Sequence, residues 1–297
     1  MKIGVVFPQT EFPPDSVQVR DYAQAVEELG FSHIHAYDHI LGANPDRPGG
    51  WTGPYTFRTP FFEPFVLFSY LAGLTRKVVF GTNILIMPQR QTALVAKQAA
   101  TLDVLSRGRL RLGVGIGWNE VEYVAQGENF HNRGKRLEEQ VALLRLLWTQ
   151  PLVKFEGKWH HVPDAGLNPL PIQQPIPIWF GGSDERALQR MARLGDGWMV
   201  NARSIEQSKP LLDKVRQFLK EAGRDQSSFG IEVRLNMSLI PQDGWINFVR
   251  AWQELGATHL TVNTMGCGYE TSSAHVDALR RFAESVDLQA EVAQRTH

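Results

Sequence analysis

The chain has 297 residues, enough for one large domain or two small ones with a substantial core. Its 31 basic and 31 acidic side chains balance, and no basic stripe stands out, which argues against a nucleic-acid partner. A lone cysteine, Cys267, excludes an internal disulfide framework and suits a reducing compartment. No apolar run approaches the ~20 residues that cross a membrane, and the N-terminal run is too short for a signal peptide. We therefore expect a cytoplasmic protein without a membrane partner.

Short apolar runs alternate with helical patterns along the whole chain. The predicted strands are 3–8, 32–38, 77–87, 109–116, 176–182, 196–201, 231–238 and 259–265. A helix is predicted after Asp15, which with Gln18 forms a capping-box signature, and further helices at 63–74, 91–106, 132–150, 184–194, 204–222, 243–254 and 273–287. Eight strands, each followed by a helix, favour an α/β fold of the (β/α)₈ TIM-barrel type over an open doubly wound sheet.

The stretch 150–175 interrupts this alternation after the fourth strand and its helix. Residues 152–162 read as a hairpin that turns at Glu156–Gly157, and 163–177 contain five prolines typical of an extended connector. No linker divides the chain, so we interpret this stretch as an insertion within a single domain, 1–297.

In a TIM barrel, functional residues lie where strands end and the following loops begin. This rule selects Gln9, Asp38, His39, Asn83, Gly117, Trp118, Gly181 to Ser183, Asn201, Asn236 and Asn263. Gly113, Gly115 and Gly117 alternate within the fourth strand, and Trp118 stands where a dinucleotide-binding fingerprint needs glycine. The glycines therefore do not indicate a dinucleotide-binding loop.

The run "AKQAATLDVLSRGRLRLGVGIGW" (96–118), with "DHI", "GTNILIMPQRQ", "PIPIWFGGS" and "LGDGW", resembles the bacterial luciferase-like family. These are flavin- and deazaflavin-dependent barrel oxidoreductases, and the chain is most similar to the branch known as coenzyme F420-dependent. The resemblance, from Ile3 to about Trp198, implies hydride transfer between F420 and a small organic substrate. It leaves open an FMN-dependent monooxygenase that uses O₂ and a flavin reductase partner. It also implies a homodimer.

The resemblance places His39 opposite the reactive edge of the cofactor ring. A histidine suits this place because it can take the proton of a substrate hydroxyl near neutral pH. In a monooxygenase the same residue would stabilise a flavin hydroperoxide. We expect the neighbouring Asp38 to orient the imidazole. A satisfied surface histidine is the alternative interpretation.

The resemblance further implies a cis peptide bond between Asn83 and Ile84, which would support the face of the ring. Asn83 would hydrogen-bond the polar edge of the ring. Gly115 and Gly117 would leave space beneath it, although small residues at these positions can equally relieve crowding inside the barrel.

The stretch "WFGGSDER" (179–186) is a strand, two glycines and a helix start. Backbone N–H groups at such a place bind phosphate, and Gly181 and Gly182 allow a close approach. Ser183 would add a hydroxyl, Arg186 a charge, and Asn201 is a weaker candidate for the same phosphate. The alternative is an ordinary glycine turn in which Ser183 caps the helix.

Trp118 replaces the glutamate that sugar-phosphate-oxidising relatives commonly carry. We therefore expect Trp118 to line an apolar substrate pocket with Phe57, Phe61 and Trp51, or these aromatic side chains simply to pack the loop.

Other classes of function find less support in the sequence. His33 and His35 could bind a metal, as in barrel hydrolases. Those barrels place the pair at the end of the first strand, whereas here it opens the second, and the late strand ends offer no cluster of histidines or acids. No G-x-S-x-G elbow indicates a nucleophilic hydrolase. A barrel that binds the cofactor without catalysis is a third alternative. We expect a redox enzyme without a metal.

Overall fold

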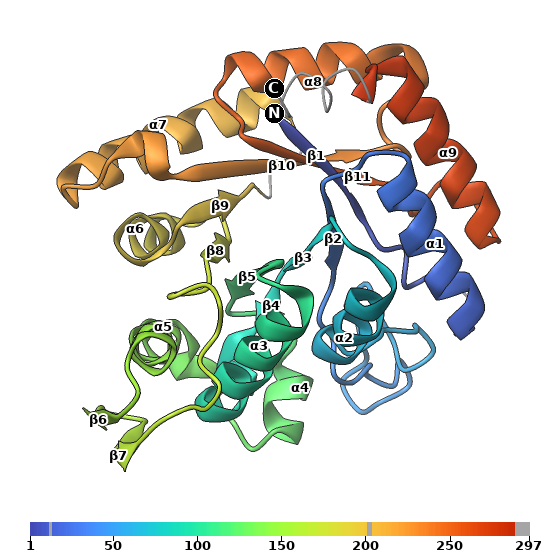
Figure 1. Cartoon of the computed structure of the whole chain (residues 1–297). Helices are drawn as coiled ribbons and strands as arrows, with labels where there is room; N and C mark the ends of the chain where they lie inside the picture. The colour runs from blue at the N-terminus through green and yellow to red at the C-terminus, as the bar shows by residue number, and fades with distance from the viewer. Residues whose placement is uncertain (12–13, 201–203, 289–297) are drawn as a thin grey trace.

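A computed structural model describes residues 1–11, 14–200 and 204–288 and confirms the TIM barrel (Figure 1). The barrel strands are β1 (Lys2–Val6), β2 (His33–Ala36), β3 (Val79–Thr82), β4 (Leu85–Ile86), β5 (Leu110–Gly115), β8 (Ile178–Gly181), β9 (Gly197–Met199), β10 (Gly230–Asn236) and β11 (His259–Asn263). Neighbouring strands pair in parallel, and pairing of β3 with β5 closes the ring. The sheet has nine segments because the third barrel strand is divided into β3 and β4.

The helices surround the strands, as Figure 1 shows. They are α1 (Ser16–Glu28), α2 (Pro64–Leu74), α3 (Thr92–Ser106), α4 (Glu120–Ala125), α5 (Arg133–Thr149), α6 (Glu185–Leu194), α7 (Ile205–Glu221), α8 (Trp245–Glu254) and α9 (Ser272–Ser285). The predicted cap is present, since the Asp15 carboxylate accepts a hydrogen bond from Gln18 N at 2.9 Å. The short helix α4 was not predicted, because six residues are too few to establish a helical period.

The predicted hairpin consists of β6 (Val153–Glu156) and β7 (His161–Ala165), which pair in antiparallel fashion. It lies at the outer edge of the molecule next to α5 (Figure 1). No helix in the described part of the chain is long and apolar enough to span a membrane.

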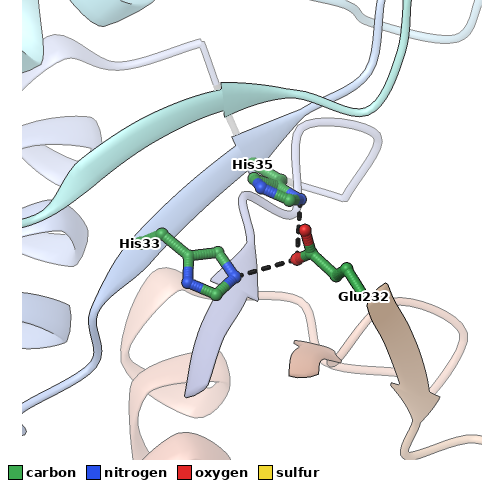
Figure 2. Close-up of side chains that lie close together, drawn as sticks. All are labelled: His33, His35 and Glu232. Carbon is green, nitrogen blue, oxygen red and sulfur yellow. Dashed lines mark hydrogen bonds and ion pairs between the residues drawn. The ribbon is translucent and has the colours of Figure 1, made fainter. Parts of the chain in front are cut away.

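The middle of the barrel contains a cluster of charged and polar side chains instead of an entirely apolar core. His33 and His35 project from β2, and the Glu232 carboxylate from β10 lies between the two imidazoles (Figure 2). Glu232 Oε1 is 2.9 Å from His33 Nε2, and Glu232 Oε2 accepts a hydrogen bond of 2.6 Å from Arg111. Arg111 also donates to His35 Nε2 at 2.7 Å. All four side chains are buried.

Glycines on the flanking strands make room for the two imidazoles. A Cβ atom on Gly4 of β1 would lie 2.3 Å from the His33 ring, and one on Gly81 of β3 would lie 2.5 Å from the His35 ring. Because real Cβ atoms do not approach other atoms this closely, the cluster depends on glycine at both positions.

The ionisation of the cluster follows from burial and from its one guanidinium. Burial alone would raise the pKa of Glu232, but the positive charge of Arg111 and the hydrogen bond from His33 hold it well below its usual range. Burial lowers the pKa of His33 and of His35, although the Glu232 carboxylate opposes this effect. The cluster therefore contains one ion pair, Arg111–Glu232, and two neutral imidazoles.

The buried histidines predict that the fold loses stability as the pH falls from 7 to 5. Burial lowers the pKa of His33 and His35, that of His259 to about 2 and that of His275 to about 4, from an ordinary 6.5. Below pH 6.5 the unfolded chain therefore binds protons that the folded chain excludes. Each such histidine costs up to about 1.4 kcal/mol per pH unit, measurable by urea unfolding at several pH values.

One variant makes this prediction specific. His275→Gln should reduce the slope of unfolding free energy against pH, because it removes a buried imidazole whose pKa is lowered to about 4. A stability that is constant between pH 7 and pH 5 would contradict the neutral state of the buried imidazoles.

Candidate active site

A cavity of about 500 Å³ opens at the carboxyl end of the barrel. Every barrel strand contributes to it. Its lining includes Thr10 after β1, Asp38 and His39 after β2, Asn83, Ile84 and Ile86 at β3 and β4, Gly117 and Trp118 after β5, Gly181 and Gly182 at β8, Met199 and Val200 at β9, Glu232, Arg234 and Asn236 on β10, and Asn263 on β11. This size is in the range of sites that hold a cofactor or a small ligand.

His39 lies in the wall of this cavity and is oriented by a buried glutamate. Its Nδ1 is 3.0 Å from Oε1 of Glu122 on α4, and the other carboxylate oxygen of Glu122 accepts from Gln89 at 3.2 Å. Because a carboxylate can only accept, Nδ1 carries a hydrogen, and in the neutral imidazole Nε2 is then the acceptor. Nε2 has no hydrogen bond to any described residue. The Glu122 carboxylate therefore fixes the orientation of the ring, with Nε2 as the nitrogen that has no partner among the described residues.

Asp38 does not orient His39, contrary to expectation. Its carboxylate accepts hydrogen bonds from Arg90 at 2.7 Å and from the backbone N of Ile86 at 2.9 Å. Arg90 also bonds Glu63 at the start of α2. The physical reason is that neighbouring residues on an extended chain point to opposite sides, so Asp38 turns toward β4 while His39 faces Glu122.

Aromatic side chains enclose the imidazole of His39. The ring centres of Tyr55 and Phe61 lie 4.9 and 4.8 Å from it, and that of Trp118 lies 5.8 Å away. Trp118 lines the cavity and also packs against Trp51. Phe57 does not join them: it is 56% exposed and its ring packs against Arg58. Tyr55, which was not predicted to belong to this group, packs against His39 instead.

The peptide bond between Asn83 and Ile84 is cis, as the resemblance implied. The Ile84 side chain fills the space above two glycines, since a Cβ on Gly115 or Gly181 would lie 2.5 or 3.0 Å from it. Gly115 thus makes room for the Ile84 side chain, which fills the space next to this glycine. Gly117 does line the cavity, in a positive-φ conformation. The Asn83 amide lies 3.2 Å from His35 Nδ1, which connects the rim of the cavity to the buried cluster.

The loop after β8 reaches the cavity through Gly181 and Gly182, and Gly182 has φ +112°, a conformation suited to glycine. The cap of α6 is Asp184, not Ser183, because the Asp184 carboxylate accepts from Ala187 N at 3.1 Å. Arg186 is exposed and lines a neighbouring cavity. The predicted Asn201 lies outside the described residues.

Two charged residues of β10 were missed, although the sequence contains a signal for them. In "IEVRLN" the polar residues Glu232, Arg234 and Asn236 alternate with apolar ones, and all three line the cavity. Alternation on a barrel strand places one set inside and the other against the helices. Arg234 donates to the hydroxyl of Tyr37 at 3.1 Å. Glu122 had no comparable signal, because its helix is short.

His33, His35 and Glu232 also form the arrangement that a metal site requires, with ligand atoms within 4.8 Å of one another. Glu232 lies in the interior of β10 and not at its carboxyl end, so a rule based on strand ends does not find it. Arg111 contacts both Glu232 and His35 and already supplies the positive charge that balances the carboxylate. A second cation at this place would meet direct repulsion, so the residues fit an internal ion pair better than a metal.

The sequence matches the family model described as luciferase-like monooxygenase over residues 1–245. An uncharacterized protein of Mycobacterium tuberculosis is 34% identical over 277 residues, which are 89% of this chain and 92% of that protein. An F420-dependent hydroxymycolic acid dehydrogenase of the same organism is 30% identical over 236 residues, 78% of this chain and 61% of that protein.

Two solved structures share the fold. An F420-dependent secondary alcohol dehydrogenase in complex with an F420–acetone adduct superposes with a TM-score of 0.78 at 18% identity, covering 96% of this chain and 98% of that one. A riboflavin lyase with modified FMN gives a TM-score of 0.71 at 17% identity, covering 80% and 62%. With its barrel and its long sequence match, the chain belongs to the luciferase-like monooxygenase family.

Proposed function

We propose that this protein is an F420-dependent oxidoreductase that transfers a hydride between the deazaflavin and a small organic alcohol or carbonyl compound. The observation that carries the proposal is the pair His39–Glu122: a histidine at the rim of the central cavity whose Nδ1 is fixed by a buried carboxylate and whose Nε2 is free among the described residues. Oxidation of an alcohol by hydride transfer needs a base of this kind.

The residues around the central cavity fit a planar ring with polar edges. The volume of about 500 Å³ is sufficient, Ile84 offers an apolar surface, and Asn83 and Arg234 offer hydrogen bonds. The loop Gly181–Gly182–Ser183 would hold the phosphate through backbone N–H groups, with Arg186 beyond it. Trp118, Phe61 and Tyr55 would line the substrate side, where their rings exclude water from His39.

A bound deazaflavin supplies the hydride acceptor, and the chain supplies orientation and proton transfer. His39 Nε2 accepts the hydroxyl proton of the substrate, and Glu122 stabilises the imidazolium that forms. Gln89 holds the second oxygen of Glu122 and so fixes the carboxylate. Asp38 acts indirectly, because with Arg90 it holds the backbone of Ile86 beside the ring site. In the opposite direction His39 returns the proton to a carbonyl oxygen.

The choice of F420 over FMN is supported by the F420-dependent dehydrogenase among the relatives. Titration of the purified protein with F420 and with FMN, oxidised and reduced, tests it. We expect F420 to bind more tightly, with a Kd measured by cofactor fluorescence. Tight binding of FMN alone would replace the proposal by a monooxygenase that uses O₂ and a flavin reductase partner.

Variants of the His39–Glu122 pair should affect turnover far more than cofactor binding. We expect His39→Ala to lower kcat by about 10²- to 10⁴-fold, because it removes the base. Glu122→Gln should lower kcat by a smaller factor, because the imidazole loses the charge that stabilises its protonated form. Glu120→Gln, on the exposed side of the same helix, serves as the matched control.

Added imidazole should restore part of the His39→Ala activity, an effect that a merely structural histidine would not show. Wild-type kcat in His39→Ala would remove this residue from its proposed role. A loss of kcat in Glu120→Gln equal to the loss in Glu122→Gln would show that Glu122 has no specific role.

The proposed phosphate position can be tested at Gly182. Gly182→Asp should weaken cofactor binding, because it brings a carboxylate to the phosphate. Gly182→Asn has nearly the same shape and the same strained φ without the charge, and is the control. A Kd that rises equally in both variants would indicate backbone strain, and an unchanged Kd in both would move the phosphate elsewhere.

A further inference from the structure

Arg234 on β10 is the only Lys or Arg side chain that lines the central cavity in the described part of the chain. The two acidic side chains of the lining already have basic partners, Asp38 with Arg90 at 2.7 Å and Glu232 with Arg111 at 2.6 Å. No described carboxylate lies within ion-pair distance of Arg234. Its guanidinium therefore brings a positive charge to the cavity that no described side chain pairs.

The guanidinium of Arg234 is held by a neutral group. Its Nη1 donates to the hydroxyl of Tyr37 at 3.1 Å, and its central carbon lies 5.8 Å from the centre of the Tyr37 ring. Its Nε is buried and has no hydrogen-bond partner among the described residues. A buried donor without an acceptor costs free energy, so such a group calls for a functional explanation. The Nη2 group also lacks a described partner and remains for a ligand.

Arg234 lies in the same part of the cavity as His39. Tyr37 precedes His39 by two residues, and the ring centre of Tyr55 lies 4.9 Å from that of His39. Burial raises the pKa of Tyr55, Tyr37 raises it further, and the charge of Arg234 opposes both effects. This influence requires Arg234 to lie near Tyr55. An anion that binds to Arg234 is therefore within the reach of one small molecule from His39.

Asn236 adds a second donor two residues further along β10. Its Oδ1 accepts a hydrogen bond from Asn263 Nδ2 at 2.9 Å, which fixes the amide and leaves Asn236 Nδ2 without a partner among the described residues. Alternate residues of a strand face the same side, and both Arg234 and Asn236 line the cavity. The cavity thus has an aromatic side around His39 and a side rich in donors along β10.

We infer that the substrate is a hydroxy acid, or the matching oxo acid, whose carboxylate binds to Arg234 while its hydroxyl or carbonyl group faces His39. A carboxylate fits this place because it accepts two parallel hydrogen bonds from a guanidinium. A neutral alcohol leaves the charged donors unpaired, and a site of this kind rejects such a ligand strongly. Arg234 is thus a specificity-determining residue.

This inference deepens the proposed function and rests on it, because it needs the deazaflavin and His39 in the same cavity. The carbinol carbon of the hydroxy acid gives up a hydride to the deazaflavin, its hydroxyl gives up a proton to His39, and the oxo acid remains. The same guanidinium can still donate to the edge of the ring, since Tyr37 and a carboxylate do not use all of its N–H groups.

The test compares short straight-chain hydroxy acids of increasing length with the primary amides of the same acids, which have nearly the same shape and no charge. Binding to the protein–F420 complex is measured by calorimetry, and the Kd for F420 by cofactor fluorescence. We expect the acid to bind more tightly than its amide. Arg234→Gln should raise the Kd for the acid by about 10- to 100-fold and leave that for the amide within about twofold.

Two further variants make the comparison specific. Arg234→Lys keeps the charge but cannot donate two parallel hydrogen bonds, so it should give an intermediate Kd for the acid. Arg58→Gln removes the same charge from an exposed position before α2 that does not line the cavity, and it is the matched control. Because Arg234 forms no described ion pair, its replacement leaves no described carboxylate without a partner.

The outcomes separate this inference from the proposed function. If wild type does not bind F420, the proposed function fails, and acid and amide are compared on the protein alone. If F420 binds but no acid binds more tightly than its amide, the function stands and the carboxylate site is overturned. A Kd for F420 that rises in Arg234→Gln as much as the Kd for the acid would assign Arg234 to the cofactor and also overturn it. Equal weakening by Arg58→Gln would do the same, because only the overall charge would then matter.

Discussion

The arrangement of the barrel depends on one buried ion pair, Arg111–Glu232. A guanidinium and a carboxylate in the interior are tolerated only if they satisfy each other and the polar groups around them. Here Arg111 contacts Glu232 at 2.6 Å and His35 at 2.7 Å, and its guanidinium lies 4.3 Å from the centre of the Trp179 ring. His35 continues to Asn83, the residue before the cis peptide bond. The charge pair in the core therefore supports the floor of the ligand cavity.

The two carboxylates at the rim of the cavity, Asp38 and Glu122, form hydrogen bonds with different partners. Asp38 accepts hydrogen bonds from Arg90 and from the backbone N of Ile86 in β4, whereas Glu122 bonds Nδ1 of His39 and orients its ring. Both are buried, so each must be satisfied within the fold. Asp38 thereby fixes the backbone of Ile86, and Glu122 fixes the ring of His39, both in the wall of the same cavity.

The cavity beside the central one, which Arg186 lines, shows how a chain without net charge can still gather positive charge in one place. Electrostatic interactions between exposed charges are screened beyond about 8 Å in physiological salt, so the local arrangement of charges matters more than their sum. Helices α5 and α6 and the tip of the hairpin bring six basic side chains to one place. The sequence shows no basic stripe because these residues come from three separate segments. They lie next to the Gly181–Gly182 loop, because Asp184, two residues later, lines the same cavity.

The sequence by itself determined the order of elements and the fold, because periodicity, caps and apolar runs are local properties of the chain. It located His39, Asn83, Gly117, Gly181 and Gly182 at the cavity, since the ends of parallel strands meet at one edge of a barrel. Only the tertiary structure paired His39 with Glu122, turned Asp38 to Arg90 and Phe57 to solvent, and joined His33 and His35 to Glu232. These partners are separated by 83, 52 and 199 positions along the chain for His39–Glu122, Asp38–Arg90 and His33–Glu232. No local pattern encodes such contacts, because they depend on how the closed ring of strands places distant side chains.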